Sequence, residues 1–98
     1  MRISVVIPTL GEQATIESAV TSALGALGPC QVIVADGGST DRTRELAASA
    51  GAVVVDAPGT RADAMNAGAR AATGGVLLFL HADTALPDGA GDAVNKTM

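Results

Sequence analysis

Aromatic side chains are almost absent from this sequence of 98 residues, which has no tryptophan, no tyrosine and a single phenylalanine, Phe79. Proteins that bind single-stranded nucleic acid stack bases on aromatic side chains, and those that bind duplexes grip phosphates with clustered basic residues. Six basic residues stand against ten acidic ones here, for a net charge of −4. We therefore predict that the chain does not bind nucleic acid. An anionic ligand needs a cation or helix N-termini to offset its repulsion from such a protein.

Cysteine and long apolar runs are also scarce. The one cysteine, Cys30, excludes an internal disulfide and leaves too little thiolate for a zinc site. No apolar run approaches the ~18 residues that a transmembrane helix needs. The start of the chain, residues 1–8, is too short for a signal peptide and is typical of a first strand. We expect one cytoplasmic domain over residues 1–98, with any membrane association made through partners.

Four short apolar runs alternate with segments that are long enough for a helix. The runs predict strands over residues 3–7, 31–35, 52–55 and 76–80. The segments between them predict helices over residues 12–24, 41–50 and 60–72, each followed by glycine. Thr60, with Asp63 three residues later, has the pattern of a capping box. Gly68, in the middle of the third helix, indicates that this helix approaches the sheet closely.

The order of these elements, βαβαβαβ, predicts an α/β fold. The strands are apolar on both faces, so we expect them to be parallel and buried between helices. Right-handed crossovers then give a doubly wound, Rossmann-like parallel sheet with the strand order 3-2-1-4. Ligands bind such sheets beyond the carboxyl ends of the strands, which makes that edge the predicted site.

Carboxylates follow two of the predicted strands. Asp36 opens the glycine-rich turn 36–39, and Asp83 comes shortly after the last strand, two residues beyond His81. Capping of the following turn is one role for these carboxylates, and ligand binding is the other. Residues i and i+2 of an extended chain point the same way, so His81 and Asp83 can meet one ligand or metal. Carboxylate and diphosphate oxygens suit Mn²⁺ or Mg²⁺.

Two residues of the third predicted helix are further candidates. Arg61 lies in its first turn, beside the same edge, where it either pairs with phosphate or stays solvated. Asn66 lies in mid-helix, where asparagine is unfavourable, and can reach toward the site. The sequence has no G-x-G-x-x-G turn, P-loop or G-x-S-x-G elbow, which argues against a nicotinamide cofactor, P-loop hydrolysis and α/β-hydrolase chemistry.

Taken together, four segments resemble a family 2 glycosyltransferase of the GT-A fold. They are SVVIPTL at residues 4–10 with Glu12, VADGGSTDRT at residues 34–43, MNAGA at residues 65–69 and LFLHADT at residues 78–84. The resemblance covers about residues 2–90. It implies a nucleotide-diphospho-sugar donor, with a UDP-sugar favoured, and a divalent metal.

The resemblance also implies roles for single residues. Asp36 would contact the base of the nucleotide. Asp83 would bind Mn²⁺ or Mg²⁺ through the donor's diphosphate, and His81 would lie near the ribose or the diphosphate. The nucleotide pocket would be lined by Pro8, Thr9 and Glu12.

Two substitutions and the length set this chain apart from many family members. Gly37 and His81 stand where those members have aspartate, and family domains are usually much longer, with the acceptor pocket and the catalytic base in the later part. We therefore assign no catalytic residue. We expect the donor-binding half of a glycosyltransferase that transfers sugar to an unknown acceptor.

Two alternatives stay open. One is a non-catalytic, truncated module that binds nucleotide or self-associates. The other is a phosphatase of the haloacid dehalogenase type, suggested by Asp83-Thr84 after an apolar strand, although His81 stands where its nucleophilic aspartate belongs. The predicted strand at residues 76–80 is an apolar edge, and we expect a homo-oligomer that covers it.

Overall fold

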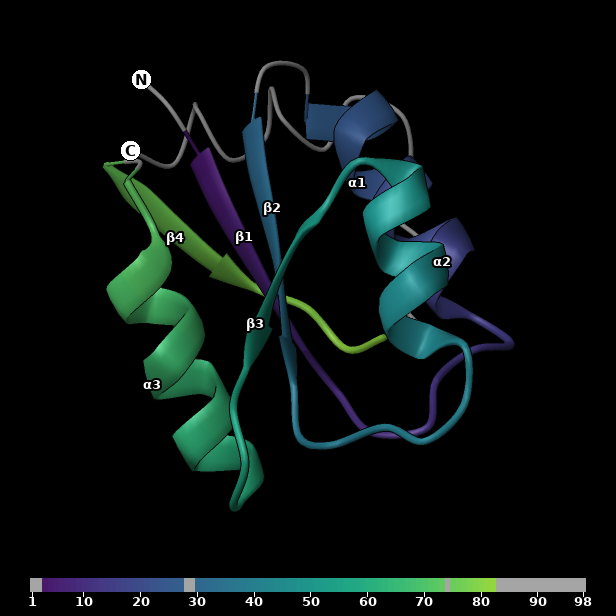
Figure 1. Cartoon of the computed structure of the whole chain (residues 1–98). Helices are drawn as coiled ribbons and strands as arrows, with labels where there is room; N and C mark the ends of the chain where they lie inside the picture. The colour runs from purple at the N-terminus through teal and green to yellow at the C-terminus, as the bar shows by residue number, and fades with distance from the viewer. Residues whose placement is uncertain (1–2, 28–29, 74, 83–98) are drawn as a thin grey trace.

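The computed structural model describes residues 3–27, 30–73 and 75–82, in which strands and helices alternate (Figure 1). The seven elements are β1 (Ile3–Thr9), α1 (Ile16–Leu27), β2 (Cys30–Asp36), α2 (Thr43–Ala50), β3 (Val53–Asp56), α3 (Arg61–Ala71) and β4 (Val76–Phe79). Every predicted element is present, which confirms the βαβαβαβ order.

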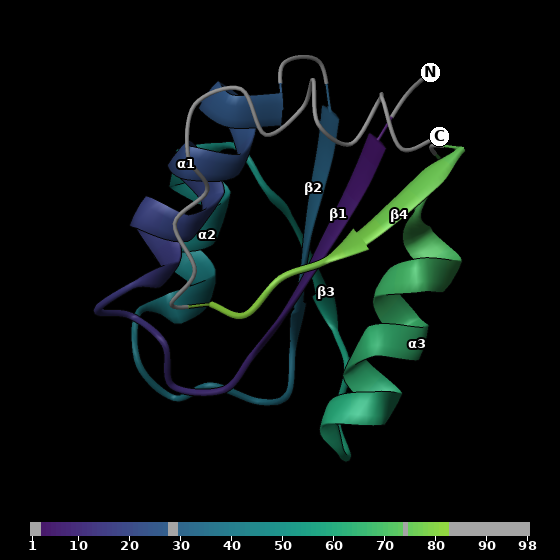
Figure 2. The same ribbon diagram turned by 180° about the vertical axis from the view of Figure 1, so that it is seen from behind.

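The four strands form one parallel sheet in the order β3-β2-β1-β4, and this confirms the predicted strand order. The inner strands β1 and β2 pair from Ile3 with Cys30 to Thr9 with Asp36. Helices α1 and α2 cover one face of the sheet and α3 covers the other, as the two opposite views show (Figures 1 and 2). The domain is therefore a three-layer α/β/α sandwich.

The larger core lies between the sheet and α1. Alternate residues of β1, namely Ile3, Val5 and Ile7, point to this face and are buried. Ile16 and Val20 of α1 meet them and are fully buried as well. Their spacing of four residues places both on one side of the helix, so the apolar stripe of α1 fixes this helix on the sheet.

The opposite face is packed by small residues. Val6 and Ala35 of the inner strands pack there against Ala64 of α3. A Cβ atom at Gly68 would collide with the side chain of Val6, so α3 lies close to β1 because this position has no side chain. The expected close approach at Gly68 is confirmed.

The bounds of α1 differ from the sequence prediction. The helix begins at Ile16 rather than at Glu12, because a turn precedes it in which the Thr15 and Ile16 amides donate to the Glu12 carbonyl at 3.1 and 2.9 Å. It also continues through Gly25 to Leu27. A single glycine lowers helix stability without ending the helix.

Side chains accept hydrogen bonds from amides at the starts of the other two helices, and at α3 the acceptor is the N-cap residue itself. The Asp41 carboxylate accepts a hydrogen bond from the Thr43 amide at 3.0 Å, so α2 starts two residues later than predicted. At α3, the Thr60 hydroxyl accepts from the Asp63 amide at 3.2 Å and the Asp63 carboxylate accepts from the Thr60 amide at 2.9 Å. The predicted capping box is thereby confirmed. Across the described ranges, no helix has both the length and the apolar character to cross a membrane.

Strand β4 forms one edge of the sheet. Among the described residues, no further strand pairs with its outer side. Leu77 and Phe79 point away from the larger core and are 44% and 41% exposed. This edge is therefore apolar, as the sequence predicts.

Candidate functional site

The carboxyl ends of the strands meet at one edge of the sheet. The register places Thr9 of β1 beside Asp36 of β2, and Asp36 beside Asp56 of β3. Directly after β4, the Leu80 amide donates to the Val6 carbonyl at 3.0 Å, which ties this segment to β1. Residues that end or directly follow the four strands therefore lie together at the carboxyl edge of the sheet, where the sequence predicts the ligand site.

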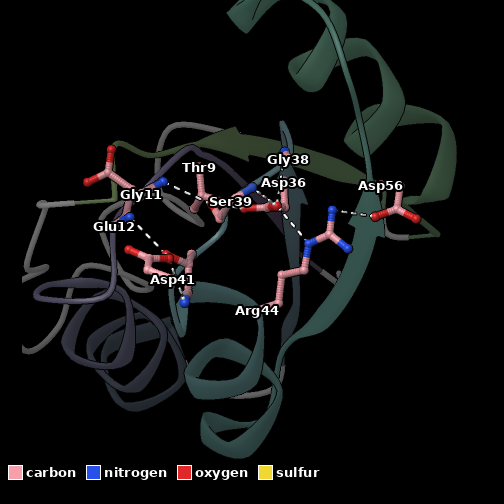
Figure 3. Close-up of polar contacts among 10 residues, drawn as sticks. Thr9, Gly11, Glu12, Asp36, Gly38, Ser39, Asp41, Arg44 and Asp56 are labelled. Carbon is pink, nitrogen blue, oxygen red and sulfur yellow. Dashed lines mark hydrogen bonds and ion pairs between the residues drawn. The ribbon is translucent and has the colours of Figure 1, made fainter.

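Asp36 is fully buried at the end of β2 and its carboxylate accepts five hydrogen bonds (Figure 3). The hydroxyls of Thr9 and Ser39 donate to Oδ1 at 2.7 and 2.5 Å. The amides of Gly38 and Ser39 donate to Oδ2 at 3.1 and 2.8 Å, and Nε of Arg44 donates to it at 2.8 Å. Both oxygens are thus used within the protein, and Asp36 organises the turn and the end of β1.

The Arg44 guanidinium joins the ends of two strands. Its Nη2 lies 2.8 Å from Oδ1 of Asp56, while its Nε binds Asp36 (Figure 3). Burial raises the pKa of Asp36, but the hydrogen bonds from Ser39, Arg44 and Thr9 outweigh it and hold this pKa well below its ordinary value. The hydrogen bond with Asp36 raises the pKa of Arg44 in turn. Asp36 and Arg44 therefore form a charged pair at neutral pH.

Hydroxyl groups near α2 hold the loop that follows β1. The Gly11 amide donates to Oγ of Ser39 at 2.9 Å, and the Glu12 amide donates to Oγ1 of Thr43 at 2.8 Å. Ser39 also binds Asp36, so the loop and the acidic turn form one hydrogen-bonded unit (Figure 3). This unit fixes the backbone at Glu12.

A pocket of about 200 Å³ lies between the end of β1 and the start of α3. Its walls combine apolar side chains with glycine backbone and a few polar groups. Its lining residues are Pro8, Thr9, Leu10, Glu12, Gly37, Gly59, Thr60, Arg61 and Ala64. Four of the predicted site residues, Pro8, Thr9, Glu12 and Arg61, are brought together here.

A second hollow, of about 330 Å³, adjoins the first and shares Glu12 and Arg61 with it. His81 and Ala82, which follow β4, complete its lining. Nη1 of Arg61 lies 2.9 Å from Nδ1 of His81. The hollow is therefore polar and presents one carboxylate, one guanidinium and one imidazole.

Two predicted site residues in the described part of the chain line neither hollow, and a third falls outside that part. Asp36 lies behind Thr9 and lines neither hollow. Asn66 is exposed on α3 and also lies outside both linings. Asp83, the predicted metal ligand, falls outside the described residues. Within the described part of the chain, no group of three or more histidine, cysteine, aspartate or glutamate side chains is placed to hold a metal ion.

Several residues of the site have no clear sequence signal. Leu10 and Gly59 line the first pocket from positions that are 49 residues apart in the chain, a distance that no local motif spans. Arg44 reaches Asp36 from the first turn of α2. A basic residue eight positions after Asp36 is the one hint that the sequence offers.

Comparisons with known proteins place this geometry in a family. The model for glycosyl transferase family 2 matches residues 4–91. Glucosyl-3-phosphoglycerate synthase from M. tuberculosis is 35% identical over 89% of this chain and 36% of its own length, with a TM-score of 0.73. The same synthase, solved with Mn²⁺, UDP and glucosyl-3-phosphoglycerate, is 34% identical over 89% of this chain and 35% of its own, also with a TM-score of 0.73.

A second solved structure shares the fold. S. aureus TarS has a TM-score of 0.84 at 24% identity, over 97% of this chain and 19% of its own length. The chain thus spans between 19% and 36% of the length of these proteins. A comparison with curated proteins gave no match. The parallel sheet, its GT-A-like strand order and the match to residues 4–91 show that this chain belongs to glycosyl transferase family 2.

Proposed function

We propose that this chain forms the donor-binding part of a glycosyltransferase that uses a nucleotide-diphospho-sugar, with a UDP-sugar favoured. One observation carries the proposal. Residues from β1, from α3 and from the segment after β4 converge on two adjoining hollows at the carboxyl edge of the sheet. Ligands of doubly wound sheets bind at this edge.

The first hollow is mainly apolar and the second is polar and charged, and these characters match the base and the diphosphate of a nucleotide. The first has apolar walls at Pro8, Leu10 and Ala64, with backbone polar groups around Gly37 and Gly59, which suits a planar base. The second contains Arg61 and His81, which suit a diphosphate. M. tuberculosis glucosyl-3-phosphoglycerate synthase, a relative, has been solved with UDP and Mn²⁺.

A divalent cation fits the charge of this site. The chain carries a net charge of −4, and Glu12 adds a carboxylate to the wall of the second hollow, so a diphosphate needs a compensating cation. We propose Asp83 as the protein ligand of Mn²⁺ or Mg²⁺, together with diphosphate oxygens and water. When bound, the cation stabilises the departing nucleotide diphosphate.

The described residues of this chain bind and orient the donor in this proposal. Thr9, held by its hydrogen bond to Asp36, and Arg61, at the capped start of α3, are positioned before the ligand arrives. The chain supplies no assigned catalytic base, and we expect little or no sugar transfer by these 98 residues alone.

Calorimetry with UDP tests the donor site. We expect UDP to bind in the presence of Mn²⁺, to bind at least tenfold more weakly without it, and to lose the Mn²⁺-dependent gain in Asp83→Ala. Asp88→Ala is the matched control, because it removes a carboxylate from the same stretch of sequence and should bind UDP as the wild type does. Absence of UDP binding, or equal binding with and without Mn²⁺, would refute the proposal.

The apolar edge of β4 favours a second role, self-association. Leu77 and Phe79 remain exposed there, and we propose that a second copy of the chain covers them through strand pairing. Light scattering should give the mass of a dimer or a higher oligomer, and Leu77→Lys should shift it to that of a monomer. A monomer at high concentration of the wild type would count against this role.

A further inference from the structure

Gly37, at the wall of the first hollow, is a glycine that the fold itself does not require. Its φ angle is not positive, whereas the next residue, Gly38, has a φ of +116° that favours glycine. A Cβ atom at Gly37 would lie 3.5 Å from the carbonyl oxygen of Thr9 and 3.8 Å from that of Ala57. It would also lie 3.9 Å from Cδ1 of Leu10. These are ordinary van der Waals contacts, so alanine would fit the folded chain at this position.

The other glycine that lines this hollow has a structural reason. Gly59 has a φ of +116°, and a Cβ atom there would collide with the Asp63 carboxylate of the capping box at α3. Gly37 has neither reason, and glycine costs stability relative to alanine because it gives the unfolded chain more freedom. A glycine without a conformational or packing cause at the wall of a hollow indicates that the hollow needs the space.

We infer that Gly37 is a specificity-determining residue of the first hollow, because its missing side chain lets the edge of a nucleobase reach the main chain between β1 and the turn after β3. This inference rests on the proposed function. In it the main chain, and not the Asp36 carboxylate, contacts the base. Asp36 lines neither hollow, and both of its oxygens accept hydrogen bonds within the protein.

The polarity of this stretch of main chain sets the kind of edge that it can bind. The Gly37 amide donates to the Thr9 carbonyl at 2.9 Å, and the Ala57 amide donates to the Asp36 carbonyl at 2.8 Å, so both N–H groups are used. The Ala57 carbonyl accepts no hydrogen bond from another described residue. A carbonyl oxygen pairs with an N–H donor, such as N3–H of uracil. A methyl group at position 37 would cover this oxygen and exclude the ligand from it.

Calorimetry on the full chain with Mn²⁺ in excess compares UDP with UDP that is methylated at N3 of uracil. The wild type should bind the methylated ligand at least tenfold more weakly, because it has lost its N–H donor and is wider at that edge. Gly37→Ala should bind UDP about tenfold more weakly than the wild type does. It should distinguish the two ligands by less than about threefold, because the contact that methylation removes is already lost in the variant.

Gly25→Ala is the matched control, because it makes the same change in α1, where the space around the new Cβ is open. This variant should bind both ligands as the wild type does. Thermal melts without ligand separate a role in binding from a role in folding, and Gly37→Ala should melt at or above the temperature of the wild type.

Three results would overturn the inference. They are equal binding of the two ligands by the wild type, unchanged UDP binding in Gly37→Ala, and a lower melting temperature for Gly37→Ala, which would make Gly37 a structural glycine. Absence of UDP binding by the wild type would instead refute the proposed function itself.

Discussion

Replacement of Asp36 by asparagine tests whether the hydrogen bonds of the buried carboxylate stabilise the carboxyl edge of the sheet. Asparagine keeps the shape, and its Oδ1 can still accept from the Gly38 amide, the Ser39 amide and Nε of Arg44, while its amide turns toward the two hydroxyls. Hydrogen bonds to a charged group contribute about 1 kcal/mol more than neutral ones, so weakening three of them should cost about 2–4 kcal/mol. That is a large share of the ~5–15 kcal/mol that stabilises a typical domain.

The pH dependence of stability gives a second, independent signature of Asp36. Its pKa is lowered in the folded protein, so its contribution to stability is complete above the unfolded pKa of 3.8 and is lost as the pH falls below that value. Asp36→Asn should lack this part of the acid destabilisation. Asp41 and Asp63 also have lowered pKa values, because they accept hydrogen bonds from Thr43 and Thr60. The unfolding free energy of the variant should therefore still fall at acid pH, but less steeply than that of the wild type.

Urea unfolding followed by far-ultraviolet circular dichroism measures both effects, because the chain has no tryptophan or tyrosine for fluorescence. Asp56→Asn is the matched control. It removes the other carboxylate that contacts Arg44, but Asp56 is 73% exposed, so the change in unfolding free energy should stay within about 1 kcal/mol. If Asp36→Asn unfolds at the same urea concentration as the wild type at pH 7, or loses no more than Asp56→Asn, the reasoning is refuted.

Two further predictions concern helices. Gly68→Ala should destabilise the protein by about 1–3 kcal/mol because the new methyl group meets Val6, whereas Gly25→Ala, with open space around its Cβ, should stabilise it by about 0.5–1 kcal/mol. Thermal melts of the two variants should shift in opposite directions, and shifts of the same sign would contradict this packing. Thr60→Ala should cost about 1 kcal/mol through loss of the cap of α3, while Thr60→Ser should retain most of it; equal melting temperatures for Thr60→Ala and the wild type would mean that the cap contributes nothing.

The order of the elements was predictable because its causes are local. Apolar β-branched runs, glycines after the helices and the Thr60–Asp63 pair each act within a few residues, and together they determine seven elements. The strand order followed from general rules for crossovers. The close approach at Gly68 was also visible, because glycine in mid-helix is costly without a packing reason.

The start of α1 and the environment of Asp36 were not predictable in the same way. The Glu12 amide is held by Thr43, 31 residues later in the sequence, and this contact extends the loop at the expense of the helix. Asp36 was expected either to contact a ligand or to cap the turn that follows it. Its hydrogen bonds with Arg44 and Thr9 arise from the tertiary packing of α2 and β1 against β2, which the sequence does not indicate. Likewise, the Arg61–His81 contact joins residues 20 positions apart and depends on where α3 lies on the sheet.

Glu12 and Arg61 belong to both hollows. If the first hollow holds the base and the second holds the diphosphate, as proposed, a substitution at either position changes the surroundings of both groups at the same time. A change of base preference at these two positions would then also change how the phosphates are bound. Residues that line one hollow alone, such as Leu10 and Gly37 on one side and His81 on the other, are where donor preference is free to diverge among proteins that keep this fold.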